Sequence, residues 1–218
     1  MARECMLARA SRRAWSECHK VAMTHAPHLP AWDVSMLLHF TAMGNAYHPA
    51  LFKLVVARAT ANNDEWTPGD LAILVGALAR VRHNDVGLMH ILVDRLESGK
   101  DDWDGNSLAS LLAGMQQLRW TSKRVLELMI PEVVLKVPTM KTKSVCEVLR
   151  VFDKAEVFDK DLLMAVHDTV LASLGYHLSG GRDRALPAHD ETIRPWRCLT
   201  QCAVLRYLSF PSIPGLPS

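Results

Sequence analysis

Apolar residues recur every 37 positions between residues 29 and 176. A first set of aligned positions begins with Val34, Leu71, Leu108 and Val145, and three residues later come Leu37, Leu74, Leu111 and Val148. Within each copy, apolar residues at i, i+3 and i+4 form one face of an amphipathic helix. A second set, which begins with Leu51, Leu88, Val125 and Leu162, predicts a second helix in each copy.

Polar residues at fixed places ahead of these helices predict where the helices begin. In the stretch Trp66 to Asp70, Thr67 is suited to cap a helix and Asp70 completes a capping box. Trp66 and Leu71 flank the cap as a hydrophobic staple, which makes the tryptophan a structural clamp. The same arrangement recurs 37 residues later, at Trp103, Asp104, Ser107 and Leu108. The aligned positions just ahead of the second helices hold His48, Asp85, Ser122 and Asp159, and three of these four are good helix caps.

Together these patterns predict an all-α protein, an α-solenoid of about four helix–turn–helix repeats of 37 residues. One helix pair of this size cannot bury its apolar faces alone, so neighbouring pairs must stack. Three residues disturb the pattern. Pro30 occupies a cap position, Lys141 is a poor cap that leaves Thr142 as an alternative start, and Pro131 predicts a kink or an early end.

The two ends of the chain differ from the repeat region. Residues 1–28 contain four arginines and two acidic residues, which fits either an organelle transit peptide or the second helix of a partial repeat. Residues 177–218 contain five of the eleven prolines and a Gly-Gly pair, which predicts loop or disorder.

Charge and composition narrow the class of protein. Residues 30–177 carry 15 Lys and Arg against 18 Asp and Glu, a net charge of −3, so the repeat region is not basic. No apolar run is long enough to predict membrane insertion. The five cysteines show no disulfide framework, which favours a reducing compartment.

The sequence contains no recognisable catalytic or cofactor motif. Cys18, His19, His25 and His28 fit no standard zinc spacing. The carboxylates near Asp159 are better explained as a solvated turn and a helix cap. We therefore expect no enzyme activity, no metal and no cofactor.

Function in helical repeat proteins usually resides in polar positions that stack from repeat to repeat. The predicted ends of the first helices carry such residues at aligned positions. The candidate RNA-binding residues are Arg80, Arg82, Gln117, Arg119 and Lys154. Arginine contacts phosphate or stacks on a base, and glutamine can read a base edge. The alternative is that these residues are ordinary solvated helix ends.

The segments Leu71–Arg80 ("LAILVGALAR") and Leu108–Leu118 ("LASLLAGMQQL") resemble the repeats of heptatricopeptide and octotricopeptide proteins of organelles. They are also similar to the repeat region of FAST-kinase-like proteins and to helical repeat subunits of the kinetoplastid mitochondrial RNA-editing substrate-binding complex. The resemblance covers residues 29–176. The small restriction-endonuclease-like domain that often ends such proteins is not evident in residues 178–218.

The resemblance implies a non-catalytic protein that binds single-stranded organellar RNA and acts in RNA processing, editing, stability or translation. It implies a mitochondrial location, with plastid or cytoplasm as alternatives. The near-neutral repeat region keeps a second interpretation open. In that interpretation the chain is a protein–protein scaffold, such as a subunit of an organellar ribosome or another large assembly, and it has protein partners in a ribonucleoprotein.

Overall fold

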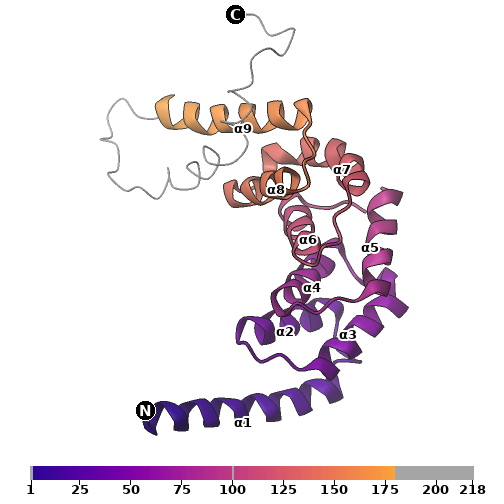
Figure 1. Ribbon diagram of the computed structural model, residues 1–218, viewed down its shortest axis with the longest axis vertical. Coiled ribbons are helices and arrows are strands. Elements are labelled where there is room, and N and C mark those ends of the chain that lie inside the picture. Colours follow the sequence, from indigo (N-terminus) through magenta and orange to yellow (C-terminus); the bar gives the residue numbers. More distant parts are fainter. Residues whose placement is uncertain (1, 100, 180–218) are drawn as a thin grey trace, which may run out of the picture. The chain divides into compact units, whose positions relative to one another are not determined.

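The computed structural model describes residues 2–99 and 101–179, and these residues form helices without any strand. The predicted all-α class is therefore confirmed, and the packing of the helices is consistent with an α-solenoid (Figure 1). The α-helices are α1 (Ala2–His25), α2 (Ala31–Met43), α3 (Pro49–Ala61), α4 (Pro68–Val81), α5 (Val86–Ser98), α6 (Gly105–Gln117), α7 (Lys123–Lys136), α8 (Thr142–Lys154) and α9 (Lys160–Ser179). Two short 3₁₀ helices are η1 (Asn63–Glu65) and η2 (Val137–Thr139).

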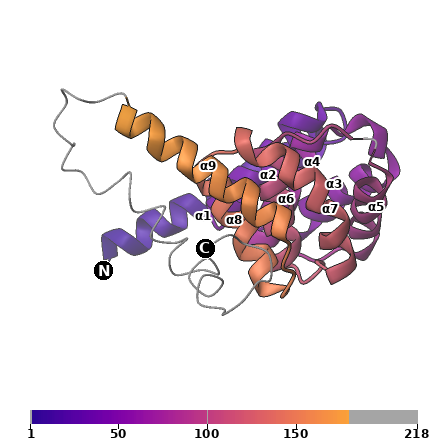
Figure 2. The same ribbon diagram turned by 90° about the horizontal axis from the view of Figure 1, so that it is seen from above.

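The chain divides into two compact units, Met1–Trp120 and Thr121–Ser218. In the first unit, α2, α4 and α6 lie side by side as one layer (Figures 1 and 2). Helix α3 packs against both α1 and α5 in a second layer. The apolar positions of the 37-residue pattern fill the space between, and Leu71, Leu74, Leu108 and Leu111 are fully buried.

The second unit contains α7, η2, α8 and α9. Helix α9 packs against α7 and η2. Val148 and Phe152 of α8 are buried, as the apolar pattern predicts. No helix among the described residues is long and apolar enough to cross a membrane.

The predicted helix caps are present. Thr67 and Asp70 form the complete capping box, with the Thr67 amide donating to the Asp70 carboxylate at 3.0 Å. Each second helix is capped by the residue expected from the sequence, and each cap accepts from the amide three residues ahead. The four capping side chains are His48, Asp85, Ser122 and Asp159.

The tryptophan clamps are buried as a staple requires, with Trp66 and Trp103 only 1% and 2% exposed. Of the two outcomes expected at Pro131, a kink or an early end, the early end does not occur, because α7 continues to Lys136. A proline at that place removes one bond of the helix, to the carbonyl four residues earlier, without stopping it. Pro30 and Lys141 occupy the N-cap positions of α2 and α8, and neither forms a side-chain cap.

The end segments are described only in part. Residues 2–25 form the single helix α1, which precedes the repeat region. Ala22 of this helix is buried. Helix α9 extends to Ser179, so it includes the first residues of the segment predicted as a tail, residues 177–218. Residue 1 and residues 180–218, including the rest of that tail, lie outside the described residues.

Candidate nucleic-acid interface

The ends of α4 and α6 position four of the five predicted RNA-binding residues. Arg80 lies in the last turn of α4, and Gln117 is the last residue of α6. Arg82 directly follows α4 as its C-cap, and Arg119 follows α6 after Leu118. All four side chains are exposed. Lys154 is also exposed, at the end of α8, but it belongs to the second unit.

Arg82 and Arg119 end their helices in the left-handed backbone conformation, with φ of 55° and 63°. The following amide closes the helix, since the His83 N–H donates to the Leu78 carbonyl at 2.9 Å and the Trp120 N–H to the Met115 carbonyl at 2.8 Å. The same conformation occurs 37 residues before and after, at Asn45 and Glu156.

This conformation adds a structural role that the sequence analysis did not predict. A non-glycine residue in the left-handed region costs about 1–2 kcal/mol. The usual signal for it is glycine, and none of the four positions has one. The backbone therefore keeps this strained turn at Arg82 and Arg119, and both side chains are exposed there.

A depression of about 380 Å³ lies on the layer of α2, α4 and α6. Its lining includes His39 of α2, Gly76 and Arg80 of α4, and Ser110 and Gln117 of α6. A side chain is missing at Gly76, where an added Cβ would meet nothing within 4 Å. We call this side of the three helices the groove face. Two of the predicted residues, Arg80 and Gln117, thus lie on one depression, and no carboxylate of the described residues lines it.

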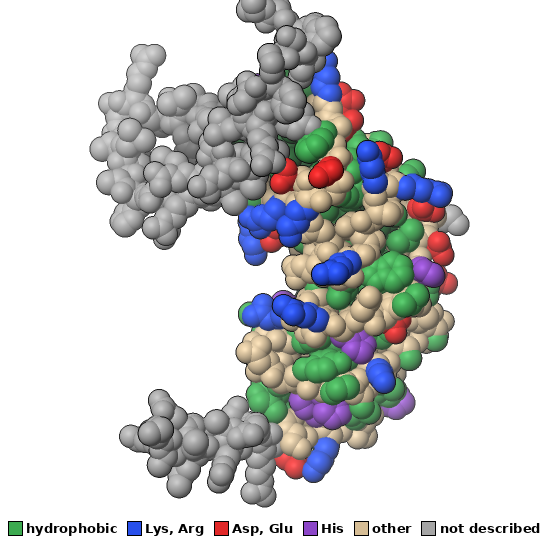
Figure 3. Space-filling view, viewed as in Figure 1, with side chains coloured by type: hydrophobic (Ala, Val, Ile, Leu, Met, Phe, Trp, Pro, Cys, Tyr) green, Lys and Arg blue, Asp and Glu red, His purple; other side chains and the backbone are tan. Residues whose placement is uncertain are grey.

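Arg80, Arg82 and Arg119 have no competing partner among the described residues. The guanidinium groups of Arg80, Arg82 and Arg119 form neither an ion pair nor a hydrogen bond there. Basic side chains are exposed over α4 and α6 in the space-filling view (Figure 3). These cations are therefore available to an anionic ligand.

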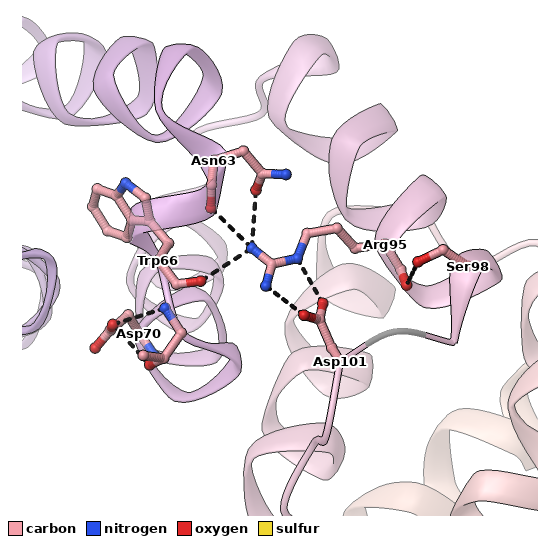
Figure 4. Close-up of polar contacts among 7 residues, drawn as sticks. Asn63, Trp66, Asp70, Arg95, Ser98 and Asp101 are labelled. Carbon is pink, nitrogen blue, oxygen red and sulfur yellow. Dashed lines mark hydrogen bonds and ion pairs between the residues drawn. The ribbon is translucent and has the colours of Figure 1, made fainter.

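Two other arginines serve the fold. Arg95 donates to the backbone carbonyls of Asn63 and Trp66 at 3.0 Å each, and both its Nε and its Nη2 contact Asp101 at 2.6 Å (Figure 4). Arg58 forms the equivalent bonds to Ala26 and Leu29, at 2.8 and 2.6 Å.

The sequence analysis missed this role of Arg58 and Arg95. The signal was present, because Arg58 and Arg95 are 37 residues apart and so are the carbonyls that each contacts. The next position in the series is Glu132, which cannot donate to carbonyls. The series of arginine contacts at 37-residue intervals therefore does not continue at Glu132.

Two histidines near the helix turns have lowered pKa values. Burial lowers the pKa of His83, and the Lys53 charge lowers it further against the opposing effect of Asp85. Its Nδ1 lies 2.8 Å from the Tyr47 hydroxyl. Burial also lowers the pKa of His19, with a further contribution from His48. Both rings are therefore held in the neutral form that the surrounding packing favours.

The candidate zinc residues do not form a site in the described part of the chain. No group of three or more His, Cys, Asp or Glu side chains there is placed to hold a metal ion. His19 instead packs its ring against Trp15 and His48.

Comparisons with known proteins add no family. No protein-family model matches the sequence, and no curated protein matches it significantly. The evidence for the candidate interface is therefore the geometry and charge of its own residues.

Proposed function

We propose that this protein is an α-solenoid of about four 37-residue repeats that binds single-stranded RNA without catalysing a reaction. The observation that supports RNA binding is the depression of the groove face. Arg80 and Gln117 line it together, and none of the described residues that line it is acidic. An unpaired guanidinium and an exposed amide are the groups that contact phosphates and base edges.

Arg82 and Arg119, on the turns of the same unit, are proposed as further RNA contacts, and Lys154 of the second unit is a separate candidate contact. The resemblance to organellar repeat proteins supports a mitochondrial site of action in RNA processing, editing, stability or translation. No cofactor is proposed.

The full-length chain should bind a fluorescein-labelled single-stranded RNA in an anisotropy titration, with an affinity that falls as salt rises. Each phosphate contact contributes about −0.7 to the slope of log K against log salt. The triple variant Arg80→Ala/Arg82→Ala/Arg119→Ala should weaken binding and reduce the slope by about 2. Unchanged affinity in a triple variant with a wild-type circular dichroism spectrum would remove the proposed site.

A matched control removes cations from the other layer of the same unit. Lys20 and Lys53 are exposed on α1 and α3. The variant Lys20→Ala/Lys53→Ala should retain wild-type affinity and slope. If the lysine variant loses as much RNA affinity per charge removed as the arginine variant does, RNA binds to net charge rather than to the groove face.

The second candidate function is a protein–protein scaffold. The net charge of −3 over residues 30–177 favours it, because it opposes tight binding driven by phosphates. A stoichiometric protein partner that co-purifies after nuclease treatment, together with no RNA binding at low salt, would establish the scaffold over the RNA-binding protein.

A further inference from the structure

The polar side chains around the depression of the groove face have unused hydrogen-bonding capacity. The depression is lined by His39, Ser107, Ser110 and Gln117, and none of these four side chains forms a hydrogen bond to another described residue. At 100° per residue, Ser107, Ser110 and Gln117 fall within about 80° of one another around the axis of α6. The depression therefore offers several hydrogen-bonding groups to one ligand.

One permanent charge accompanies these neutral groups among the described residues that line the depression. It is the guanidinium of Arg80, which has no ion-pair partner in the described part of the chain. Arg80 and Gln117 occupy the same position of the 37-residue repeat in consecutive helices of the layer. A cation beside neutral hydrogen-bonding groups fits a ligand that has one anionic part and one uncharged polar part.

Gly76 makes room for such a ligand. It lines the depression, and a Cβ added there would meet nothing within 4 Å. The aligned residues are His39 in α2 and Ala113 in α6, so the glycine is specific to α4. The volume of about 380 Å³ lies near the lower end of the range of small-ligand pockets, about 300–1,000 Å³. The depression therefore has the size for one small ligand rather than for a folded segment.

The lining fits a nucleotide better than a peptide. Peptides usually bind at a free strand edge, in an apolar groove, on aromatic rings or at a cluster of arginines. The described residues contain no strand, and those that line the depression include one arginine and no Phe, Tyr or Trp. Their apolar side chains are only Ala72 and Ile73. An unpaired nucleotide, by contrast, brings a phosphate for a guanidinium and a base edge for amides and hydroxyls.

We propose that the depression holds one unpaired nucleotide of single-stranded RNA, with its base in the space at Gly76, its base edge bonded to Gln117 and Ser110, and its phosphate at Arg80. This inference rests on the proposed RNA-binding function and assigns the part of the site that holds a base. The base contributes affinity that is independent of salt, and the phosphate contributes affinity that depends on it.

The test fills the depression in the full chain and uses a labelled 12-nucleotide oligouridine and an abasic oligomer of the same length. Gly76→Leu should fold, because leucine is a good helix former and its Cβ has open space. It should weaken binding to oligouridine by at least about fivefold, since a base contact is lost. Binding to the abasic oligomer and the slope of log K against log salt should stay at their wild-type values.

A matched control adds the same side chain in the other layer of the first unit. Gly87 is exposed on α5, and the nearest atom to a Cβ added there is 3.4 Å away. Gly87→Leu should bind both oligomers as the wild type does. An equal loss in this control would overturn the nucleotide pocket, since it would show a general effect of an added leucine.

A second pair of variants separates the base from the phosphate. Arg80→Ala should weaken binding to oligouridine and oligoadenosine by the same factor and reduce the salt slope by about 0.7. Gln117→Ala should change the ratio of the two affinities and keep the slope, because a base edge is read by the amide and not by the phosphate contact. A ratio that is unchanged in both Gln117→Ala and Gly76→Leu would overturn the assignment of a base to the depression.

Uridine 5′-monophosphate as a competitor distinguishes RNA from a free nucleotide. It should displace oligouridine only far above the Kd of the RNA, because it makes few of the phosphate contacts. A mononucleotide that binds as tightly as the oligomer, and loses affinity in Gly76→Leu, would replace RNA as the ligand.

The remaining outcomes separate this inference from the proposed function. If the wild type binds RNA and Gly76→Leu binds it equally well, the nucleotide pocket is wrong and the RNA-binding function stands. If the wild type binds no RNA at low salt, the proposed function fails and this inference fails with it. A nuclease-resistant protein partner that is lost in Gly76→Leu, with RNA affinity unchanged, would overturn the proposal in favour of a protein ligand.

Discussion

The exposed and half-buried arginines of the first unit divide into two kinds according to what their guanidinium groups contact. Arg58 and Arg95 each bind two backbone carbonyls of the preceding segment, which fixes the entry to the next helix pair. Arg82 and Arg119 contact no partner among the described residues, and their backbone ends a helix. At Arg82 and Arg119 the fold depends on the main chain, and the proposed function depends on the side chain.

Replacing Arg82 and Arg119 by glycine should separate these two contributions. Glycine relieves a left-handed strain of about 1–2 kcal/mol, offset by about 0.4–1 kcal/mol of extra entropy in the unfolded chain. Each site therefore contributes between about 0 and 1.6 kcal/mol, so the free energy of unfolding of the double variant, measured in urea, should stay level or rise by up to about 3 kcal/mol, while RNA affinity falls.

The matched control is Arg82→Ala/Arg119→Ala, which keeps the strain and loses the same cations. It should bind RNA as weakly as the glycine variant without the gain in stability. A glycine variant less stable than the alanine variant would contradict the strain assigned to these turns.

At the scale of the helices, close packing of α4 against α6 depends on a missing side chain. A Cβ at Gly114 would lie 2.8 Å from the Val75 side chain and 3.4 Å from the Val75 backbone carbonyl. Gly76, in the middle of α4, faces open space and leaves the depression empty. Gly114 therefore permits the close packing of α4 against α6, whereas Gly76 determines the shape of the depression.

Alanine at these glycines should have opposite effects. Gly114→Ala should destabilise the protein by about 1–3 kcal/mol, because the neighbouring backbone must move to admit the methyl group. Gly76→Ala should stabilise it by about 0.5–1 kcal/mol, since alanine is the better residue within a helix. Urea unfolding of both variants checks the pair, and a stabilised Gly114→Ala would show that the helices can separate at little cost.

The sequence predicted the helices and their caps because both depend on local patterns. The Asp70 side chain accepts from the Thr67 amide, and the Asp85 side chain accepts from an amide three residues ahead. Because the partners are so close along the chain, the local sequence determines these contacts. The left-handed turns were not foreseen, because Arg82 and Arg119 lack the glycine that usually marks them.

The depression was also beyond the sequence pattern. It depends on which side chains of α2, α4 and α6 become neighbours, and the spacing along one helix does not determine that. The exposure of Phe40 is a related case, because the aligned Ala77 is buried and periodicity alone predicts the same for both. The contacts of Arg58 and Arg95 could have been predicted from the repeat. The two arginines are 37 residues apart, and so are the backbone carbonyls that they contact.

At the scale of the whole molecule, stability should depend on pH through His19 and His83. Both have pKa values lowered in the folded state, mainly by burial. Below the unfolded value of about 6.5 the unfolded chain therefore binds more protons, and stability falls as pH decreases toward the folded pKa values. Above that pH their contribution is fully present.

Thermal melts followed by circular dichroism at pH 7.5 and 5.5 measure this effect. The wild type should melt at a lower temperature at pH 5.5, and His19→Gln/His83→Gln should show a smaller difference between the two pH values. The control His25→Gln/His28→Gln changes two exposed histidines and should keep the wild-type difference. An unchanged difference in the first variant would assign the pH dependence to other groups.

The left-handed turns at Asn45, Arg82, Arg119 and Glu156 have a consequence for how such a protein can evolve. The four positions hold a neutral, two positive and one negative side chain on the same backbone geometry. Mutation there can change the charge of the surface with little effect on folding, so selection for a new ligand would meet few constraints from stability. A protein engineer could vary these four positions together in a library and expect most members to fold.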